Sequence, residues 1–211
     1  IMHLLKEGQS VAIISDAGSP LVSDPGYKLV RDCIRDSIEV FAIPGACSVI
    51  TALQVSGLPS DQFHFAGFLP TKMGQIKTKL QELLSIEGTL IFFESPKRIA
   101  KTLAAILEVY GERQLVIARE LTKKFEEIRR GNTSELLDYY KTNIPKGEIV
   151  LLIEGFNKEH TVLDEDKILA EIQKLLKTYS IKDISQMLAD KYKVSKRDIY
   201  NKALIINAKQ K

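Results

Sequence analysis

The chain of 211 residues is 45% hydrophobic and 27% charged, which are the proportions of an ordinary globular protein. No run of about 18 apolar residues occurs, so a transmembrane helix is excluded, and the first residues lack the apolar stretch of a signal peptide. The two cysteines form no CxxC pair and the three histidines lie far apart, so we expect no metal site and a cytoplasmic location. The net charge of +3 permits a polyanionic partner without requiring one.

Short apolar runs alternate with helical patterns as far as Gly155, which is the rhythm of an α/β protein. Pro59 and Pro70 bracket the stretch where we place a hinge between two α/β halves. We expect strands at residues 11–14, 39–43, 64–66, 89–93, 115–118, 126–130 and 149–153. We expect helices at residues 27–35, 48–55, 75–84 and 99–109, and a further helix capped by Thr133 or Ser134.

Residues 158–211 differ in composition, because they contain no glycine, no strand pattern and many lysines. Three helices fit this part, at residues 165–177, 181–192 and 195–208, with Ser195 as the N-cap of the last one. The short Lys193–Val194 connection gives the last two helices a helix-turn-helix-like arrangement.

Two interpretations of this helical part remain open. In one, Tyr200 stacks on a base beside a phosphate-facing surface formed by Lys182, Lys191, Lys193, Lys196, Arg197 and Lys202. In the other, the lysines are only solvated around a small core of Ile181, Ile184, Leu188, Ile199 and Leu204.

Three sites at the ends of predicted strands have the composition of ligand-binding segments, since open α/β sheets bind ligands at the carboxyl ends of their strands. Residues 15–26 form a loop of small residues, prolines and aspartates, for which a tight turn is the alternative explanation. Residues 43–48 lead into a predicted helix, and the free N–H groups at its start suit the polar edge of a ligand. The alternative explanation is an ordinary strand-to-helix turn. The charged segments 93–98 and 119–123 are either a site or a structural salt-bridge network.

Five sequence motifs occur in order along the chain, whereas the P-loop, dinucleotide and GxSxG fingerprints are absent. The motifs are DAGSPLVSDPG, IPGACSVITALQVSGLPSDQF with GFLP, FFESPKR, ARELTKKFEE and KGEIVLLIEG. Together they resemble the family of ribosomal RNA small subunit methyltransferase I, within the tetrapyrrole-methylase superfamily of S-adenosylmethionine enzymes. The resemblance covers Leu4 to Gly155, and the tail is similar to the family's helix-turn-helix-like extension.

The resemblance implies transfer of a methyl group to the 2′-hydroxyl of a cytidine in small-subunit ribosomal RNA. It also implies a cytoplasmic homodimer that binds S-adenosylmethionine between two α/β halves. The fold expected is therefore α/β, with residues 1–58 as the remainder of a cofactor-binding subdomain, 59–157 as a second subdomain and 158–211 as a helical module. Family members begin with further strands and a Gly-rich loop, so we expect this first subdomain to be N-terminally truncated by roughly 60 residues.

Carried over residue by residue, the resemblance implies cofactor contacts at Gly18, Ser19, Val22, Cys47, Ser48, Glu94 and Thr122. Because a ribose hydroxyl is a poor nucleophile, a base or a lysine-stabilised alkoxide is expected, for which the candidates are Glu94, Glu120 and Lys123. Arg98 and Arg119 are the candidates for holding the adjacent phosphate.

Two other functions compete with this one. A small-molecule tetrapyrrole methylase of the same superfamily would bind cofactor without RNA. A non-catalytic nucleic-acid-binding module would bind RNA without cofactor, using the helix-turn-helix-like tail.

Overall fold

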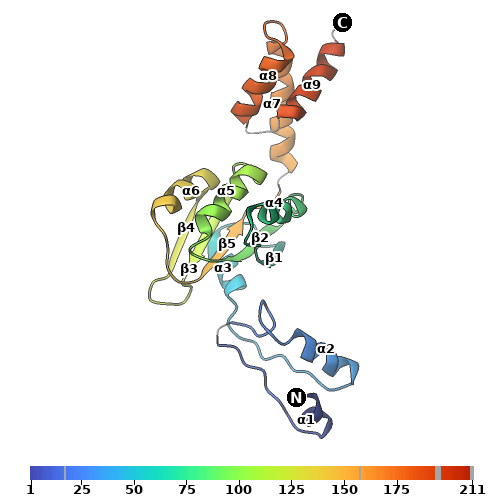
Figure 1. The fold of residues 1–211 in the computed structure, drawn as a ribbon, viewed down its shortest axis with the longest axis vertical. Coiled ribbons are helices and arrows are strands. Elements are labelled where there is room, and N and C mark those ends of the chain that lie inside the picture. The colour runs from blue at the N-terminus through green and yellow to red at the C-terminus, as the bar shows by residue number, and fades with distance from the viewer. Residues whose placement is uncertain (17, 157, 193–195, 210–211) are drawn as a thin grey trace.

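The computed structural model describes the whole chain except residues 17, 157, 193–195 and 210–211 (Figure 1). Its strands are β1 (Phe63–Phe68), β2 (Thr89–Glu94), β3 (Gln114–Arg119), β4 (Glu127–Asn132) and β5 (Ile149–Ile153). Its helices are α1 (Met2–Lys6), α2 (Tyr27–Arg35), α3 (Ser48–Ser56), α4 (Met73–Glu82), α5 (Ile99–Tyr110), α6 (Thr133–Thr142), α7 (Lys158–Leu175), α8 (Ile181–Tyr192) and α9 (Lys196–Lys209).

One five-stranded sheet with the order β1-β2-β5-β3-β4 organises the middle of the chain. β1 and β2 pair in parallel, whereas β5 runs antiparallel to β2 and β3, and β4 runs antiparallel to β3. The sheet is therefore mixed, and β1, β2 and β3 end at the same edge. That edge carries the charged segments that follow β2 and β3.

Helices cover both faces of the sheet, because the middle positions of β2, β3 and β5 are continuously apolar and not apolar only at alternate positions. On one face, α4, α5 and α6 pack on Leu90, Phe92, Ile117 and Leu151. On the other face, Val49 and Leu53 of α3 join a smaller core built from Ile91, Val116, Ala118, Val150 and Leu152. The α/β class is confirmed. The helix α3, which we assigned to the unit 1–58, thus packs on the sheet of the unit 59–157.

The helical part has its own core, separate from the two cores of the sheet. Ile172 of α7 packs with Ile184 and Leu188 of α8 and with Ile199 and Ala203 of α9. Leu204, which we expected in this core, is 44% exposed. Ser195 and the Lys193–Val194 connection lie outside the described residues, so the predicted cap and turn stay predictions.

The described part of the first 47 residues, which leaves out residue 17, contains α1, α2 and long stretches without regular structure, and it extends away from the sheet (Figure 1). The strands predicted at residues 11–14 and 39–43 are wrong: neither run is paired, and Ile14 and Ile43 are 89% and 88% exposed. An apolar run becomes a strand only where a neighbouring strand accepts its backbone hydrogen bonds, and here neither run has one. On α2, Cys33 is the one buried residue.

A smaller difference concerns the residue that caps α6. The helix α6 is capped by Asn132 with Glu135 in a capping box, and not by Thr133 or Ser134. Among the described residues, no helix combines the length and the apolarity that a membrane span requires.

Gly155 allows the chain that leaves β5 to cross directly over the turn before β2, where Phe156 donates its N–H to the Ile86 carbonyl at 2.7 Å. A β-carbon on Gly155 would overlap the backbone carbonyl of Glu87 and lie 2.6 Å from the Gly88 oxygen. We therefore expect Gly155→Ala to lower the free energy of unfolding by about 1–3 kcal/mol, the usual effect of overpacking. The measurement is a urea denaturation midpoint at unchanged slope.

Gly74→Ala is the matched control, because Gly74 lies in α4 and no atom lies within 4 Å of its virtual β-carbon. Alanine there should raise the free energy of unfolding by about 0.5–1 kcal/mol, since glycine is unfavourable inside a helix. Equal midpoints for the two variants would contradict the close crossing.

Candidate functional site

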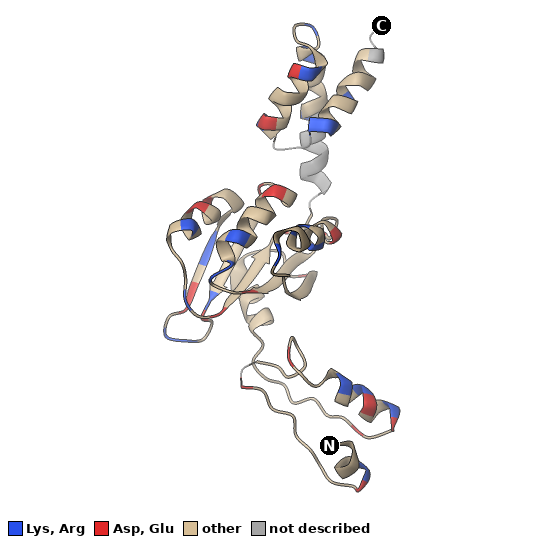
Figure 2. Ribbon diagram, viewed as in Figure 1, with Lys and Arg blue, Asp and Glu red and all other residues tan. Residues whose placement is uncertain are grey.

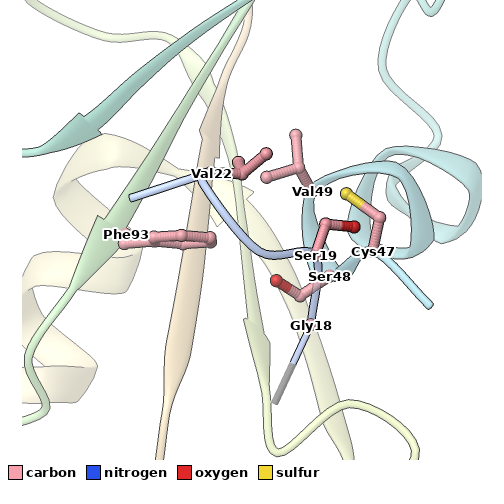
Figure 3. A pocket seen from close by; sticks show the side chains of 7 residues that line it. All are labelled: Gly18, Ser19, Val22, Cys47, Ser48, Val49 and Phe93. Atoms are coloured by element: carbon pink, nitrogen blue, oxygen red, sulfur yellow. The ribbon is translucent and has the colours of Figure 1, made fainter. Parts of the chain in front are cut away.

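A pocket forms where two loops of the N-terminal segment meet the end of β2 (Figure 3). Its cavity volume is about 60 Å³, well below the roughly 300–1,000 Å³ of typical ligand pockets. Most of its side chains are small, and Figure 3 shows the ring of Phe93 opposite Ser19 and Ser48. The lining residues are Gly18, Ser19, Val22, Cys47, Ser48, Val49 and Phe93.

Local backbone geometry brings the two loops together. Gly18 has a φ of +75°, a left-handed conformation that glycine adopts without strain. The Ser19 hydroxyl donates to the Ala46 carbonyl at 3.3 Å, which links the first loop to the second. Cys47 is extended and Ser48 starts α3, whose first turn presents N–H groups that have no partner within the helix. The pocket therefore offers small side chains, backbone donors and one aromatic surface.

Five of the seven predicted cofactor residues line this one pocket, although they come from loops 25 or more residues apart. Their role as cofactor contacts stays a prediction. Glu94 and Thr122, the other two, do not line it. Val49 and Phe93 also line the pocket but were not among the predicted cofactor residues, although Phe93 begins the candidate segment 93–98. Strand alternation would have indicated Phe93, since Phe92 on β2 faces the α5 side and its neighbour must face the loops.

Glu94 lies at the end of β2 with a fully buried side chain and three hydrogen-bond donors. The Ser95 N–H donates at 2.6 Å, the Arg98 Nε at 2.8 Å and the Thr102 hydroxyl at 2.5 Å. Arg98 also donates to the Leu69 carbonyl at 2.8 Å. The two residues thus join β2, α5 and the segment after β1. The guanidinium of Arg98 makes its hydrogen bonds to groups of the protein itself.

A second charged cluster follows β3, at the same edge of the sheet. The Glu120 Oε1 accepts from the Glu148 N–H at 2.9 Å and from the Lys123 Nζ at 3.1 Å, and Lys123 also contacts the Glu148 carboxylate at 2.8 Å. The Glu148 N–H and the Lys123 ammonium lower the pKa of Glu120. The carboxylates of Glu148 and Glu120 raise the pKa of Lys123, so it stays a cation at neutral pH.

The guanidinium of Arg119 also contacts groups of the protein itself. Its Nη2 lies 3.0 Å from the Glu127 carboxylate and its Nη1 donates to the Lys146 carbonyl at 3.4 Å. Its Nε is buried and has no hydrogen-bond partner in the part of the chain that the structure describes. Arg98 and Arg119, the predicted phosphate contacts, are therefore both anchored within the protein, and their contact with a phosphate stays a prediction.

Other candidates lie elsewhere in the molecule. Among the described residues, no three His, Cys, Asp or Glu side chains gather as a metal site would require. On the helical part, Tyr200 is 41% exposed, as the base-stacking interpretation needs, whereas Lys191 pairs with Glu171 and Lys196 donates to Gln186 at 2.6 Å. Both interpretations of this surface therefore stay open.

Comparison with known proteins adds independent information. The model of the Tetrapyrrole (Corrin/Porphyrin) Methylases family matches residues 1–137. The chain is 43% identical over 204 residues to the ribosomal RNA small subunit methyltransferase I of Rickettsia prowazekii, which covers 95% of this chain and 72% of that protein. It is 43% identical over 203 residues to the protein of the same name from Vibrio cholerae serotype O1, covering 95% and 70%.

Among solved structures, the methyltransferase CobJ superposes with a TM-score of 0.55 over 73% of this chain and 68% of that one. At 17% identity, this likeness shows the fold alone.

The substitution Arg98→Ala tests whether the charged residues after β2 stabilise the fold. Removing its side chain leaves the buried Glu94 carboxylate without its cation, which typically costs about 3–5 kcal/mol of unfolding free energy. We expect Arg98→Ala to lose close to that amount in urea denaturation. The neighbouring Lys97 is exposed, and Lys97→Ala should stay within about 0.5 kcal/mol of the parent chain. An Arg98→Ala chain as stable as the Lys97→Ala chain would show that the buried pair is dispensable.

Proposed function

Because this chain belongs to the tetrapyrrole (corrin/porphyrin) methylase family, we propose that it is an S-adenosylmethionine-dependent methyltransferase acting on small-subunit ribosomal RNA. The acceptor we propose is the ribose 2′-hydroxyl of a cytidine. Relatives 43% identical over most of this chain carry the name ribosomal RNA small subunit methyltransferase I, which supports this substrate over a tetrapyrrole. The observation that carries the proposal is the pocket beside β2.

We propose that this small pocket holds one part of the cofactor, because its chemistry suits a polar edge beside an apolar group. Gly18, Ser19 and Cys47 leave room for a ligand to approach the backbone, and the first N–H groups of α3 are donors for a polar edge. The Phe93 ring supplies an apolar surface for a flat base or an alkyl chain. When bound, S-adenosylmethionine would supply an electrophilic methyl group, so the protein's task is to position the acceptor and to handle its proton.

We assign the electrostatic part of that task to Lys123. Its raised pKa makes it a poor base at neutral pH and a permanent cation. A cation beside the ribose hydroxyl stabilises the negative charge that develops on the oxygen as its proton leaves. Glu120 and Glu148 hold the ammonium in place, and the lowered pKa of Glu120 keeps it charged for that role. Glu120 is then a positioning residue.

The phosphates of the RNA require cations with free donors. Arg98 and Arg119 donate within the protein, so we propose that they shape the edge on which the RNA lies. The exposed Lys124 and Lys146 on adjacent loops carry charge at that same edge. As in the family, the active species we propose is a cytoplasmic homodimer.

The cofactor pocket can be blocked selectively. Ser48 lines the pocket at the start of α3, so Ser48→Phe should fill it and weaken S-adenosylmethionine binding by more than about tenfold in titration calorimetry. The exposed Ser60 lies outside the pocket lining, and Ser60→Phe should bind as the parent chain does. Equal affinities of both variants, or no binding by the parent chain, would count against the cofactor proposal.

Lys123→Met tests the electrostatic assignment, since methionine keeps the length of the side chain without its charge. We expect the turnover number for methylation of small-subunit RNA to fall by about 10²–10³, the effect of losing one oxyanion-stabilising donor, with unchanged cofactor affinity. With lysine present, the loss of rate from deprotonation should begin at a higher pH than for an ordinary lysine, because the neighbouring carboxylates raise the pKa of Lys123.

Lys79→Met is the matched control, because Lys79 forms an exposed ion pair with Glu82 at 3.1 Å on α4. A turnover number equally reduced in both variants, or reduced in neither, would remove Lys123 from the mechanism.

A further inference from the structure

The loop of residues 120–126, which joins β3 to β4, carries an exposed aromatic side chain among cations. Phe125 is 65% exposed, and the Lys124 Nζ lies 5.7 Å from the centre of its ring. Figure 2 shows this loop extending beyond the edge of the sheet where β3 ends, with basic residues along it. This is the edge where β2 ends beside the pocket, because β2 and β3 run in the same direction.

The loop is held in one shape by its own hydrogen bonds. The Thr122 N–H donates to the Glu126 carboxylate at 2.6 Å, and the Glu126 N–H donates back to the Lys123 carbonyl at 3.1 Å. Glu120 and Thr122 adopt left-handed φ values of 50° and 63°. The Glu120 N–H also donates to the Glu148 carbonyl at 3.0 Å, which fixes the base of the loop to the strand β5. The backbone of the loop that carries Phe125 is therefore already ordered.

The position of Phe125 differs from that of the other aromatic residues at this edge. Phe65 and Phe68 pack against Phe93, with ring centres 4.9 and 5.4 Å apart. The only ring contact recorded for Phe125, within the part of the chain that the structure describes, is with Lys124. An exposed aromatic ring on an ordered loop beside cations is the combination by which proteins bind unpaired nucleic-acid bases, since every base has a π-face and a nearby phosphate.

We propose that Phe125 stacks on an unpaired base of the RNA substrate while Lys124 contacts a neighbouring phosphate. The inference rests on the proposed function and adds a binding element for single-stranded RNA at the edge that carries Lys123. It also explains an apolar ring left in water by a loop that is otherwise well bonded. A base held here would place its neighbouring nucleotides along the edge between the loop and the pocket.

The test measures the affinity of the full chain for a fluorescein-labelled, cytidine-containing single-stranded oligoribonucleotide of about 12 nucleotides, by fluorescence anisotropy. Phe125→Ala should weaken binding by about fivefold or more, the loss expected for one stacked base. Phe125→Trp should restore it, because tryptophan keeps a stacking surface. Lys124→Ala should reduce the slope of log affinity against log salt by about 0.7, as expected for one phosphate contact.

Phe41→Ala is the matched control, since Phe41 is 78% exposed but lies in the N-terminal segment; its affinity should equal that of the parent chain. Parent-level RNA affinity of Phe125→Ala would overturn the stacking inference alone. A lower molecular mass of Phe125→Ala in light scattering, with RNA affinity unchanged, would also overturn it and make Phe125 part of an interface between copies of this chain. A parent chain that binds S-adenosylmethionine but not the RNA would overturn the inference and the proposed substrate together, whereas failure to bind the cofactor contradicts the proposed function by itself.

Discussion

The buried carboxylate of Glu94 is the interaction on which the edge of the sheet depends. A charge without solvent is strongly unfavourable unless donors surround it, and here a backbone N–H, a guanidinium and a hydroxyl do so. These donors come from the turn after β2 and from α5, so the end of the strand cannot move without breaking them. Phe93, the residue before Glu94, is thereby fixed as one wall of the pocket. The position of the proposed cofactor surface thus follows from an ion pair that does not touch it.

The opposite wall depends on much weaker constraints. The loops that carry Gly18 and Ser48 are linked by the hydrogen bond from the Ser19 hydroxyl to the Ala46 carbonyl, and the segment they belong to exposes many of its apolar residues. The α3 helix is the exception, since it packs on the sheet and Arg130 of β4 donates to the carbonyls of Val55 and Ser56 at its end. The pocket therefore has one side that is held firmly by the sheet and α3. Its other side, the loop that carries Gly18, is stabilised by few packing contacts.

Sequence patterns correctly predicted helices, which depend on local hydrogen bonds, and strands at the centre of the sheet, which are continuously apolar. The bounds of α2, α8 and β5 agree with the prediction, because periodicity and continuous apolar runs leave little choice there. The runs at residues 11–14 and 39–43 look the same in sequence as β5, but a strand needs a pairing neighbour, which a single run does not specify. The motifs after β2 and β3 located the charged clusters, and the resemblance to a family located five residues of the pocket. Phe93 was missed because its apolar character marks it equally as core.

Sequence spacing could not separate a structural charge pair from an available one. Glu94 and Arg98 are four residues apart, and Glu120 and Lys123 are three apart, each after an apolar strand. Burial separates them: the exposed fractions are 0% and 23% in the first pair, against 17% and 47% in the second. Breaking a buried pair costs several kcal/mol, whereas an exposed pair contributes about 0–1 kcal/mol. Lys123, held by Glu120 and Glu148, is therefore still accessible to a substrate oxygen, whereas Arg98 is committed to the buried Glu94. We accordingly assign the chemistry of this edge to the end of β3, which solvent reaches.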